Sequence, residues 1–153
     1  YWPLDALDLY WDALPDPKRL LYLPNVGHGA NDFPRLLGGL AALHDHVVRG
    51  PALPEPRWLF DEFEDRLRVR VASDTQPSAV TAWTASSPTR DFREARWSSR
   101  PCLAGNGEFT CEVDRVAHRF TALFAEAAYP IHGAPTVFLS TQVRIVPPPT
   151  EGE

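Results

Sequence analysis

The spacing of hydrophobic and polar positions changes near residue 51. Between residues 3 and 50, apolar residues recur every three or four positions, which is typical of helices with one buried face. Between residues 57 and 147 they alternate with polar residues, which is typical of antiparallel strands. The proline-rich segment 51–56 predicts a linker between two parts, and residues 148–153 predict a short tail.

The first part, residues 1–50, is predicted to contain a helix, a strand and a second helix. The apolar spacing predicts a helix over 3–14, which ends at the two prolines of 15–17. The apolar run 20–23 predicts a buried strand over 19–23. A second helix is predicted over 33–49, because an Asn-Asp capping pair precedes it and Gly50 follows it. Its apolar stripe comprises Phe33, Leu36, Leu37, Leu40, Leu43 and Val47.

The second part, residues 57–147, is predicted to form about seven strands. The clearest alternation lies in 65–72, where Leu67, Val69 and Val71 are separated by arginines. The number, length and spacing of the strands predict an immunoglobulin-like β-sandwich. The predicted strands are 58–63, 65–72, 78–86, 91–98, 108–113, 118–127 and 136–146.

Cys102 and Cys111, the two cysteines of the sequence, flank the hairpin turn signal Gly105-Asn106-Gly107. Cysteines on either side of such a turn can face each other across two strands. The spacing favours a disulfide over two buried free thiols, and closing this loop would stabilise the fold by roughly 2.5–3 kcal/mol. A disulfide favours a protein exported to an oxidising compartment, secreted or periplasmic.

Composition narrows the classes of partner. A net charge of −5 gives no reason to expect nucleic acid, and no apolar run is long enough for a transmembrane segment. His44 and His46 stand two positions apart on the predicted helix, a spacing that does not suit a metal pair. We therefore expect neither a metal nor a cofactor. Because the chain begins with Tyr1, we expect it to be the C-terminal part of a longer protein.

His28 is the candidate catalytic residue. It lies between Gly27 and Gly29 after the predicted strand 19–23, and flanking glycines leave an imidazole uncovered. An exposed histidine loop between a strand and a helix is how α/β-hydrolases present their catalytic base, and the histidine comes last in their triad. The serine and the acid would then precede this chain. The alternative is a surface-loop histidine without a catalytic role.

Three segments carry a resemblance to a known family: residues 1–12, 21–29 and 87–93. They resemble the C-terminal part of the PhoPQ-activated pathogenicity-related protein family, which includes the autocrine proliferation repressor proteins. The resemblance implies an α/β-hydrolase domain, related to secreted serine peptidases, followed by a β-sandwich. It implies that the family's acid would precede Tyr1, so that only His28 of the triad lies in this chain.

These observations predict the C-terminal part of a secreted α/β-hydrolase-like protein. Residues 1–50 would end the hydrolase domain and pack against an N-terminal hydrolase core outside the chain, and residues 57–147 would form an accessory sandwich. The full-length protein would act on a peptide or ester, whereas this chain alone would be inactive. One alternative is a non-catalytic secreted signalling or binding protein that keeps the hydrolase fold. Another is a glycan-binding β-module that stacks sugars on Trp58, Trp83 or Trp97.

Overall fold

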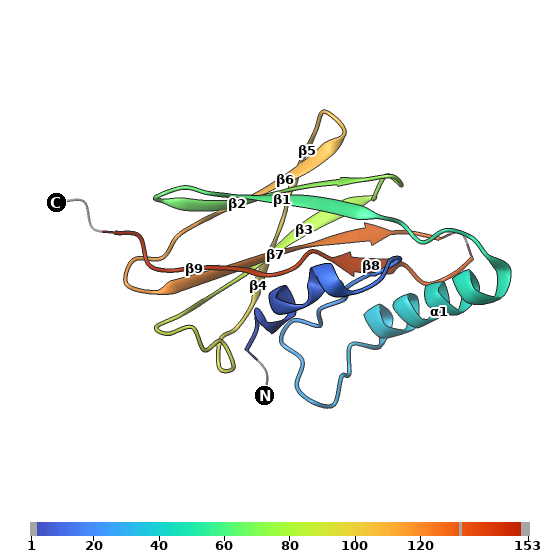
Figure 1. Ribbon diagram of the computed structural model, residues 1–153, viewed down its shortest axis with the longest axis horizontal. Helices are drawn as coiled ribbons and strands as arrows, with labels where there is room; N and C mark the ends of the chain where they lie inside the picture. The colour runs from blue at the N-terminus through green and yellow to red at the C-terminus, as the bar shows by residue number, and fades with distance from the viewer. Residues whose placement is uncertain (1–2, 132, 151–153) are drawn as a thin grey trace.

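The computed structural model, which describes residues 3–131 and 133–150, has two antiparallel sheets packed face to face (Figure 1). The first sheet consists, in spatial order, of β1 (Pro56–Glu62), β2 (Arg66–Ser73), β6 (Glu108–Asp114) and β5 (Leu103–Gly105). The second consists, in spatial order, of β4 (Ser98–Pro101), β3 (Ala79–Ser87), β7 (Phe120–Tyr129) and β8 (Val137–Ser140), with β9 (Arg144–Val146) also paired to β7. The β-sandwich prediction is therefore confirmed.

The main core fills the space between the two sheets. Alternate residues of β2 point into it, and Leu67, Val69 and Val71 are at most 1 % exposed. From the second sheet, Leu123 and Ala125 of β7 point into the same space and are fully buried. Period-two alternation on one buried face is sufficient to specify this part of the fold.

Strand β7 is buried on both faces, because the second sheet is covered on both sides. Its sequence from Phe120 to Tyr129 is almost continuously apolar and shows no alternation, as expected for a doubly covered strand. Its outward-pointing residues, Ala122 and Phe124, belong to a second apolar cluster together with Tyr22. This outer cluster is covered in part by residues 3–50, which lie along that face (Figure 1).

The α/β-hydrolase architecture expected for residues 1–50 is wrong. The structure is mostly antiparallel β-sheet with one α-helix, and none of the strands described lies between residues 3 and 50. Instead of a helix, 3–14 contains two short 3₁₀-helices, η1 (Ala6–Leu9) and η2 (Trp11–Ala13). Residues 1 and 2, which begin the family-like segment, lie outside the described residues.

The segment 19–23, predicted as a strand, does not form one. Two hydrogen bonds join it to the end of β8: Ser140 N–H donates to Leu20 O (2.7 Å), and Tyr22 N–H donates to Ser140 Oγ (3.0 Å). The second bond uses a side chain, so no continuous backbone ladder forms. Pro24, which lacks an N–H group, follows directly.

Helix α1 (Phe33–Arg49) has the predicted bounds, with the side chain of Asp32 as its N-cap and Gly50 in the left-handed conformation at its C-terminus. Its orientation could not be read from its pattern. The face that lies on the sandwich carries the buried residues Gly38 and Ala42, whereas most of the apolar stripe is exposed. At 17 residues, α1 is not long and apolar enough to cross a membrane, and neither is any other helix in the described part of the chain.

The predicted strands agree with β1, β2, β3, β6 and β7 to within a few residues. Two predicted strands differ. The segment 91–98 is mostly loop, because Phe92 and Trp97 pack on the outer cluster rather than in a ladder. The segment 136–146 divides into β8 and β9, because the Thr141 hydroxyl accepts a hydrogen bond from Ala125 N–H (3.0 Å) and so takes the place of a ladder bond.

Candidate functional site

His28 lies in an exposed turn just before α1. Ala30 N–H donates to Gly27 O (3.1 Å) and closes the turn around it. The base of the loop is fixed by Asn25, whose amide nitrogen donates to Trp97 O and whose amide oxygen accepts from Trp97 N–H, both at 2.8 Å. This arrangement holds the loop on the sandwich and leaves the imidazole accessible. A catalytic role for His28 stays a prediction.

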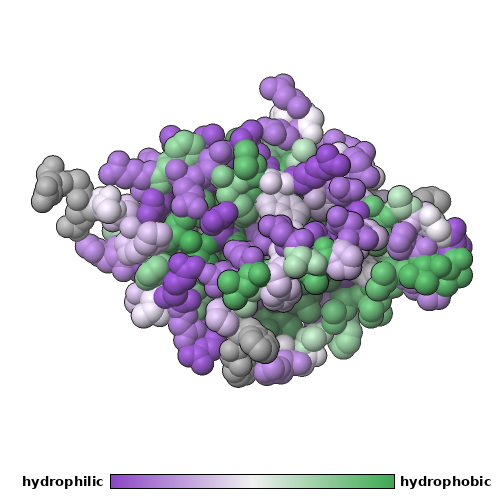
Figure 2. Space-filling view, viewed as in Figure 1, coloured by the Kyte–Doolittle hydropathy of each residue, from purple (hydrophilic) through white to green (hydrophobic). Residues whose placement is uncertain are grey.

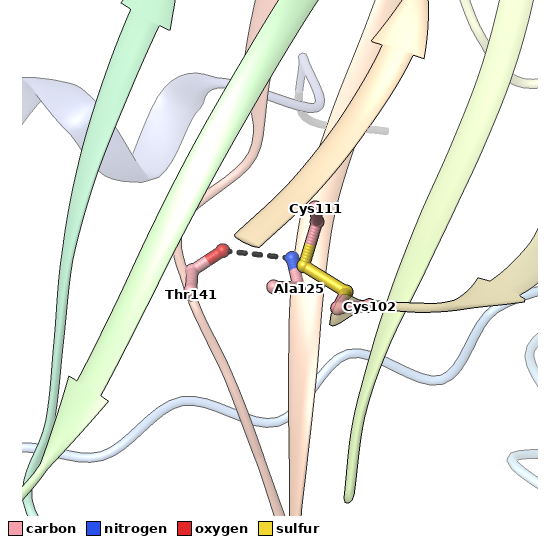
Figure 3. The surroundings of a disulfide bond; sticks show 4 residues. All are labelled: Cys102, Cys111, Ala125 and Thr141. Carbon is pink, nitrogen blue, oxygen red and sulfur yellow. Dashed lines mark hydrogen bonds between the residues drawn. A yellow bond between two sulfur atoms is a disulfide. The ribbon is translucent and has the colours of Figure 1, made fainter. Parts of the chain in front are cut away.

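Cys102 and Cys111 form the predicted disulfide (Figure 3). Cys102 lies where the chain leaves β4 in the second sheet and enters β5 in the first, and its N–H donates to Val80 O (2.9 Å). Cys111 lies on β6 and is 1 % exposed. The bond therefore fixes the point at which the chain changes sheets, and we assign it a structural role.

Two of the three tryptophans proposed for sugar stacking pack against Phe124 of β7. Trp83 stacks on Phe124 with ring centroids 6.4 Å apart, and Trp97 meets the same ring edge-on at 5.1 Å. Trp58 on β1 is partly buried against the main core, and it also pairs with Trp11 of η2 at a centroid distance of 6.0 Å and an interplanar angle of 48°. Trp11 was not among the predicted stacking residues, since its spacing suggested a helix face.

A surface hollow of about 320 Å³ lies beside this ring pair, and we call it the Trp11–Trp58 hollow. It forms where the edge strands β1 and β8 of the two sheets meet and residues 11–20 cover the gap. A second hollow, of about 260 Å³, is lined by the same two rings. The Trp11–Trp58 hollow is lined by Trp11, Asp12, Asp16, Lys18, Arg19, Leu20, Glu55, Pro56, Arg57, Trp58, Ser140 and Gln142.

Cations hold the wall of the hollow in place. Lys18 Nζ lies 5.2 Å from the centroid of the Trp11 ring and donates to Trp11 O (2.9 Å). Arg19 Nε donates to Pro54 O (2.5 Å), which ties residues 11–20 to the segment before β1. Arg19 also lies 3.9 Å from a carboxylate oxygen of Glu55. These contacts give the wall a defined shape before any ligand binds.

The second hollow has a more polar lining. Asp8 accepts a hydrogen bond from the Gln142 amide (2.7 Å), and Arg144 contributes a positive charge. Burial raises the pKa of the Asp8 carboxyl, while the charge of Arg144 and the Gln142 hydrogen bond act in the opposite direction. Together the two hollows offer donors and acceptors around an aromatic pair.

A buried ion pair fixes α1 on the sandwich, and sequence reasoning missed it. Glu126 on β7 is 3 % exposed and accepts two hydrogen bonds from Arg35, at 2.6 and 2.9 Å. The hydrogen bond to Glu126 raises the pKa of Arg35. The guanidinium also lies over the rings of Trp83 and Phe138. The only sequence signal was a single glutamate inside the apolar run of 120–129.

The remaining polar clusters are explained by local pairing. Within residues 3–131 and 133–150, no group of three or more metal-ligating side chains comes together. His46 Nδ1 lies 2.8 Å from Pro51 O at the end of α1. On β2, Arg68 pairs with Glu112 (2.8 Å) and Arg70 with Asp61 (3.1 Å). These charges offset one another and do not form a ligand site.

Comparisons with known proteins give two matches. A family model described as "PhoPQ-activated pathogenicity-related protein" matches residues 1–93. No curated protein sequence matches the chain. Among solved structures, one titled "Crystal structure of Br derivative BhCBM56" is similar at 10 % identity and a TM-score of 0.43, covering 63 % of this chain and 96 % of that chain.

Proposed function

Because this chain belongs to the PhoPQ-activated pathogenicity-related protein family, we propose that it serves as a non-catalytic binding module of an exported member. The ligand we propose is a carbohydrate, and the site is the Trp11–Trp58 hollow. The observation that carries the proposal is an aromatic pair beside an open hollow whose walls hold both carboxylates and cations. The disulfide supports export, secreted or periplasmic.

The chemistry of the hollow suits a sugar. A pyranose ring has apolar C–H faces, which pack on indole, and a rim of hydroxyl groups, which both donate and accept hydrogen bonds. Asp12 and Glu55 supply acceptors, and Arg57 supplies donors. A hollow of about 320 Å³ is at the lower end of small-ligand sites, and so fits one or two sugar rings.

The tilt of the ring pair narrows the binding mode. Two coplanar tryptophans would form a platform for a long, flat polysaccharide chain, but Trp11 and Trp58 meet at 48°. At a centroid distance of 6.0 Å, no sugar ring fits between them. The site would therefore take the end of an oligosaccharide against one indole, with its hydroxyl groups directed to the polar wall.

The test is a titration with neutral and amino-sugar oligosaccharides, followed by calorimetry and tryptophan fluorescence. Trp11→Ala should weaken binding at least tenfold, because one stacking surface is lost. The matched control is Tyr10→Ala, since Tyr10 is a half-exposed neighbouring aromatic that does not line the hollow. Arg57→Ala should weaken binding without removing an aromatic ring. If no oligosaccharide produces heat or a fluorescence change, the carbohydrate proposal is wrong.

A second candidate function rests on His28. Its exposed turn, held by Asn25 and Trp97, would let the imidazole act as general base toward a serine supplied by residues outside this chain. The substrate would be a peptide or an ester. This proposal needs no hydrolase fold in residues 1–50, only an accessible histidine beside a second surface.

The two functions are separable by activity. We expect this chain alone to hydrolyse neither esters nor peptides, because the serine and the acid would have to come from outside it. In a full-length parent, His28→Ala should lower turnover by about 10⁴-fold and leave the melting temperature unchanged. His44→Ala, an exposed histidine on α1, is the control. A fully active His28→Ala parent would exclude the catalytic role.

A further inference from the structure

The outward face of α1 carries six of the thirteen exposed large hydrophobic side chains among the described residues. Figure 2 shows hydrophobic residues gathered over this helix. Isolated exposed apolar residues are ordinary, but a contiguous set on one helix face marks an interaction site. Six large side chains on the helix are between 52 % and 74 % exposed: Phe33, Leu37, Leu40, Leu43, Val47 and Val48.

The sandwich does not need this stripe. The opposite face of α1 already contacts the sheet through Gly38, where an added Cβ would lie 2.0 Å from Thr136 O. The same face is fixed by the Arg35–Glu126 pair. Small residues and one ion pair therefore hold the helix in place. The hydrophobic stripe that would ordinarily do so points away from the protein.

The order of residues in the stripe matches what a second helix requires. Phe33, Leu40 and Val47 recur every seven residues and Leu43 falls between them, which matches the a/d arrangement of helices that pack side by side, while Leu36 at the remaining d position is partly buried. No lysine, arginine or carboxylate lies within the stripe, so two copies would meet without like-charge repulsion. The charged residues of α1 lie elsewhere and are paired: Arg35 with Asp32 and Glu126, and Arg49 with Asp45.

The size of the stripe also fits a second copy. Six side chains of this size, each more than half exposed, present roughly 600 Å² of apolar surface, the upper end for a monomer and close to the ~800 Å² per partner of a stable interface. A membrane surface is a poorer occupant. Helices that lie on anionic lipid carry unpaired lysines and arginines on the polar face, whereas Arg35 and Arg49 are paired and the chain has a net charge of −5.

We propose that α1 is a self-association surface, through which two copies of this chain pair with their apolar stripes in contact. A symmetric pair uses the same patch on both copies, which a self-complementary apolar stripe satisfies. The pairing leaves the Trp11–Trp58 hollow outside the interface, because none of the residues that line the hollow belongs to α1. The dimer would then present two binding sites.

The test measures the mass of the chain by light scattering and analytical ultracentrifugation from low to high micromolar concentration. We expect a monomer–dimer equilibrium, and Leu40→Glu should weaken it at least a hundredfold by placing a charge in the centre of the stripe. Leu103→Glu is the matched control, since Leu103 is 79 % exposed near the β5–β6 turn and should leave the dimer intact. Unchanged melting temperatures would show that both variants fold.

Two results would overturn the proposal. One is a wild-type chain that stays monomeric at every concentration, which would assign the stripe to a different protein or domain. The other is a dimer that persists in Leu40→Glu, which would place the interface elsewhere. Sedimentation with vesicles of neutral and anionic lipid is expected to leave the chain in solution. Cosedimentation that Leu40→Glu abolishes would assign the stripe to a membrane surface instead.

Discussion

The two faces of the second sheet are held by different kinds of interaction. Its inner face meets the first sheet through alternating apolar side chains such as Leu123 and Leu67, which are fully buried. Its outer face meets residues 3–50 partly through Phe124 and Tyr22, but also through the Arg35–Glu126 pair and the Ser140 hydrogen bonds. The outer layer carries His28 and the exposed stripe, and it forms the Trp11–Trp58 hollow together with β1 of the first sheet.

The difference in the interactions on the two faces predicts which layer tolerates substitution. In the inner core, each buried Leu or Val contributes about 1.5–3 kcal/mol through many contacts, so one volume-conserving substitution is absorbed by its neighbours. The outer layer combines an apolar cluster with a few polar contacts of fixed geometry. A single polar substitution there should therefore cost more than an exchange of one core hydrophobic residue for another.

The largest expected effect is the loss of Glu126. Glu126→Ala should destabilise the protein by about 3 kcal/mol or more, because it leaves the Arg35 guanidinium half-buried with Asp32 as its remaining ionic partner. Urea unfolding measures the change. The control is Glu112→Ala, which breaks the more exposed pair with Arg68 and should cost less than about 1 kcal/mol. Equal losses in the two variants would contradict the proposed importance of the outer ion pair.

The next effect is removal of the disulfide. Replacing both Cys102 and Cys111 by alanine should cost roughly 2.5–3 kcal/mol, because the unfolded chain regains the freedom of a closed loop. Reduction of the wild-type chain should produce a similar loss in urea unfolding. The outer layer should be unaffected. A chain equally stable with and without reductant would show that the sheet crossover needs no covalent tie.

A smaller effect is expected at Gly38. Gly38→Ala should destabilise by about 2 kcal/mol, because the new methyl group would meet the backbone oxygen of Thr136 at 2.0 Å and push α1 from the sheet. Gly39→Ala is a matched control, since its nearest contact is the Leu21 side chain at 3.5 Å and the helix gains propensity. The measurement is the melting temperature of each variant. Similar values would mean that α1 can shift without cost.

The smallest effect depends on pH. Burial raises the pKa of Tyr22 to about 12, from about 10 when the chain is unfolded. The folded state therefore favours the neutral phenol. Tyr22 therefore contributes to the free energy of unfolding in full below pH 10, and this stabilisation is lost as the pH rises from 10 to 12. In Tyr22→Phe, the free energy of unfolding should fall less between pH 10 and pH 12 than in the wild type, by on the order of 1–2 kcal/mol. Urea unfolding at both ends of that range measures the difference. Tyr10→Phe, which alters an exposed ring, should leave the decline unchanged.

Several features could be predicted because they depend on local rules. The bounds of α1 follow from a capping aspartate and a C-terminal glycine, and the disulfide follows from two cysteines around a hairpin turn. The aromatic pair at the hollow could not be predicted in the same way. Trp11 and Trp58 lie 47 positions apart, and nothing in either segment indicates that η2 covers the edge of β1.

The sequence by itself determined the alternating strands, the family and the amphipathic helix, because period and capping are properties of neighbouring residues. Only the tertiary structure decided what residues 1–50 pack against. The run 19–23 has the composition of a buried strand, but it lies beside the end of β8 and makes two hydrogen bonds there. The stripe of α1 likewise has the pattern of a core-facing surface. The direction in which the stripe points is set by the contacts of Gly38 and Arg35 on the opposite face of the helix. The partner of Arg35, Glu126, lies 91 positions away, and pairing over that separation leaves no periodic signal along the chain.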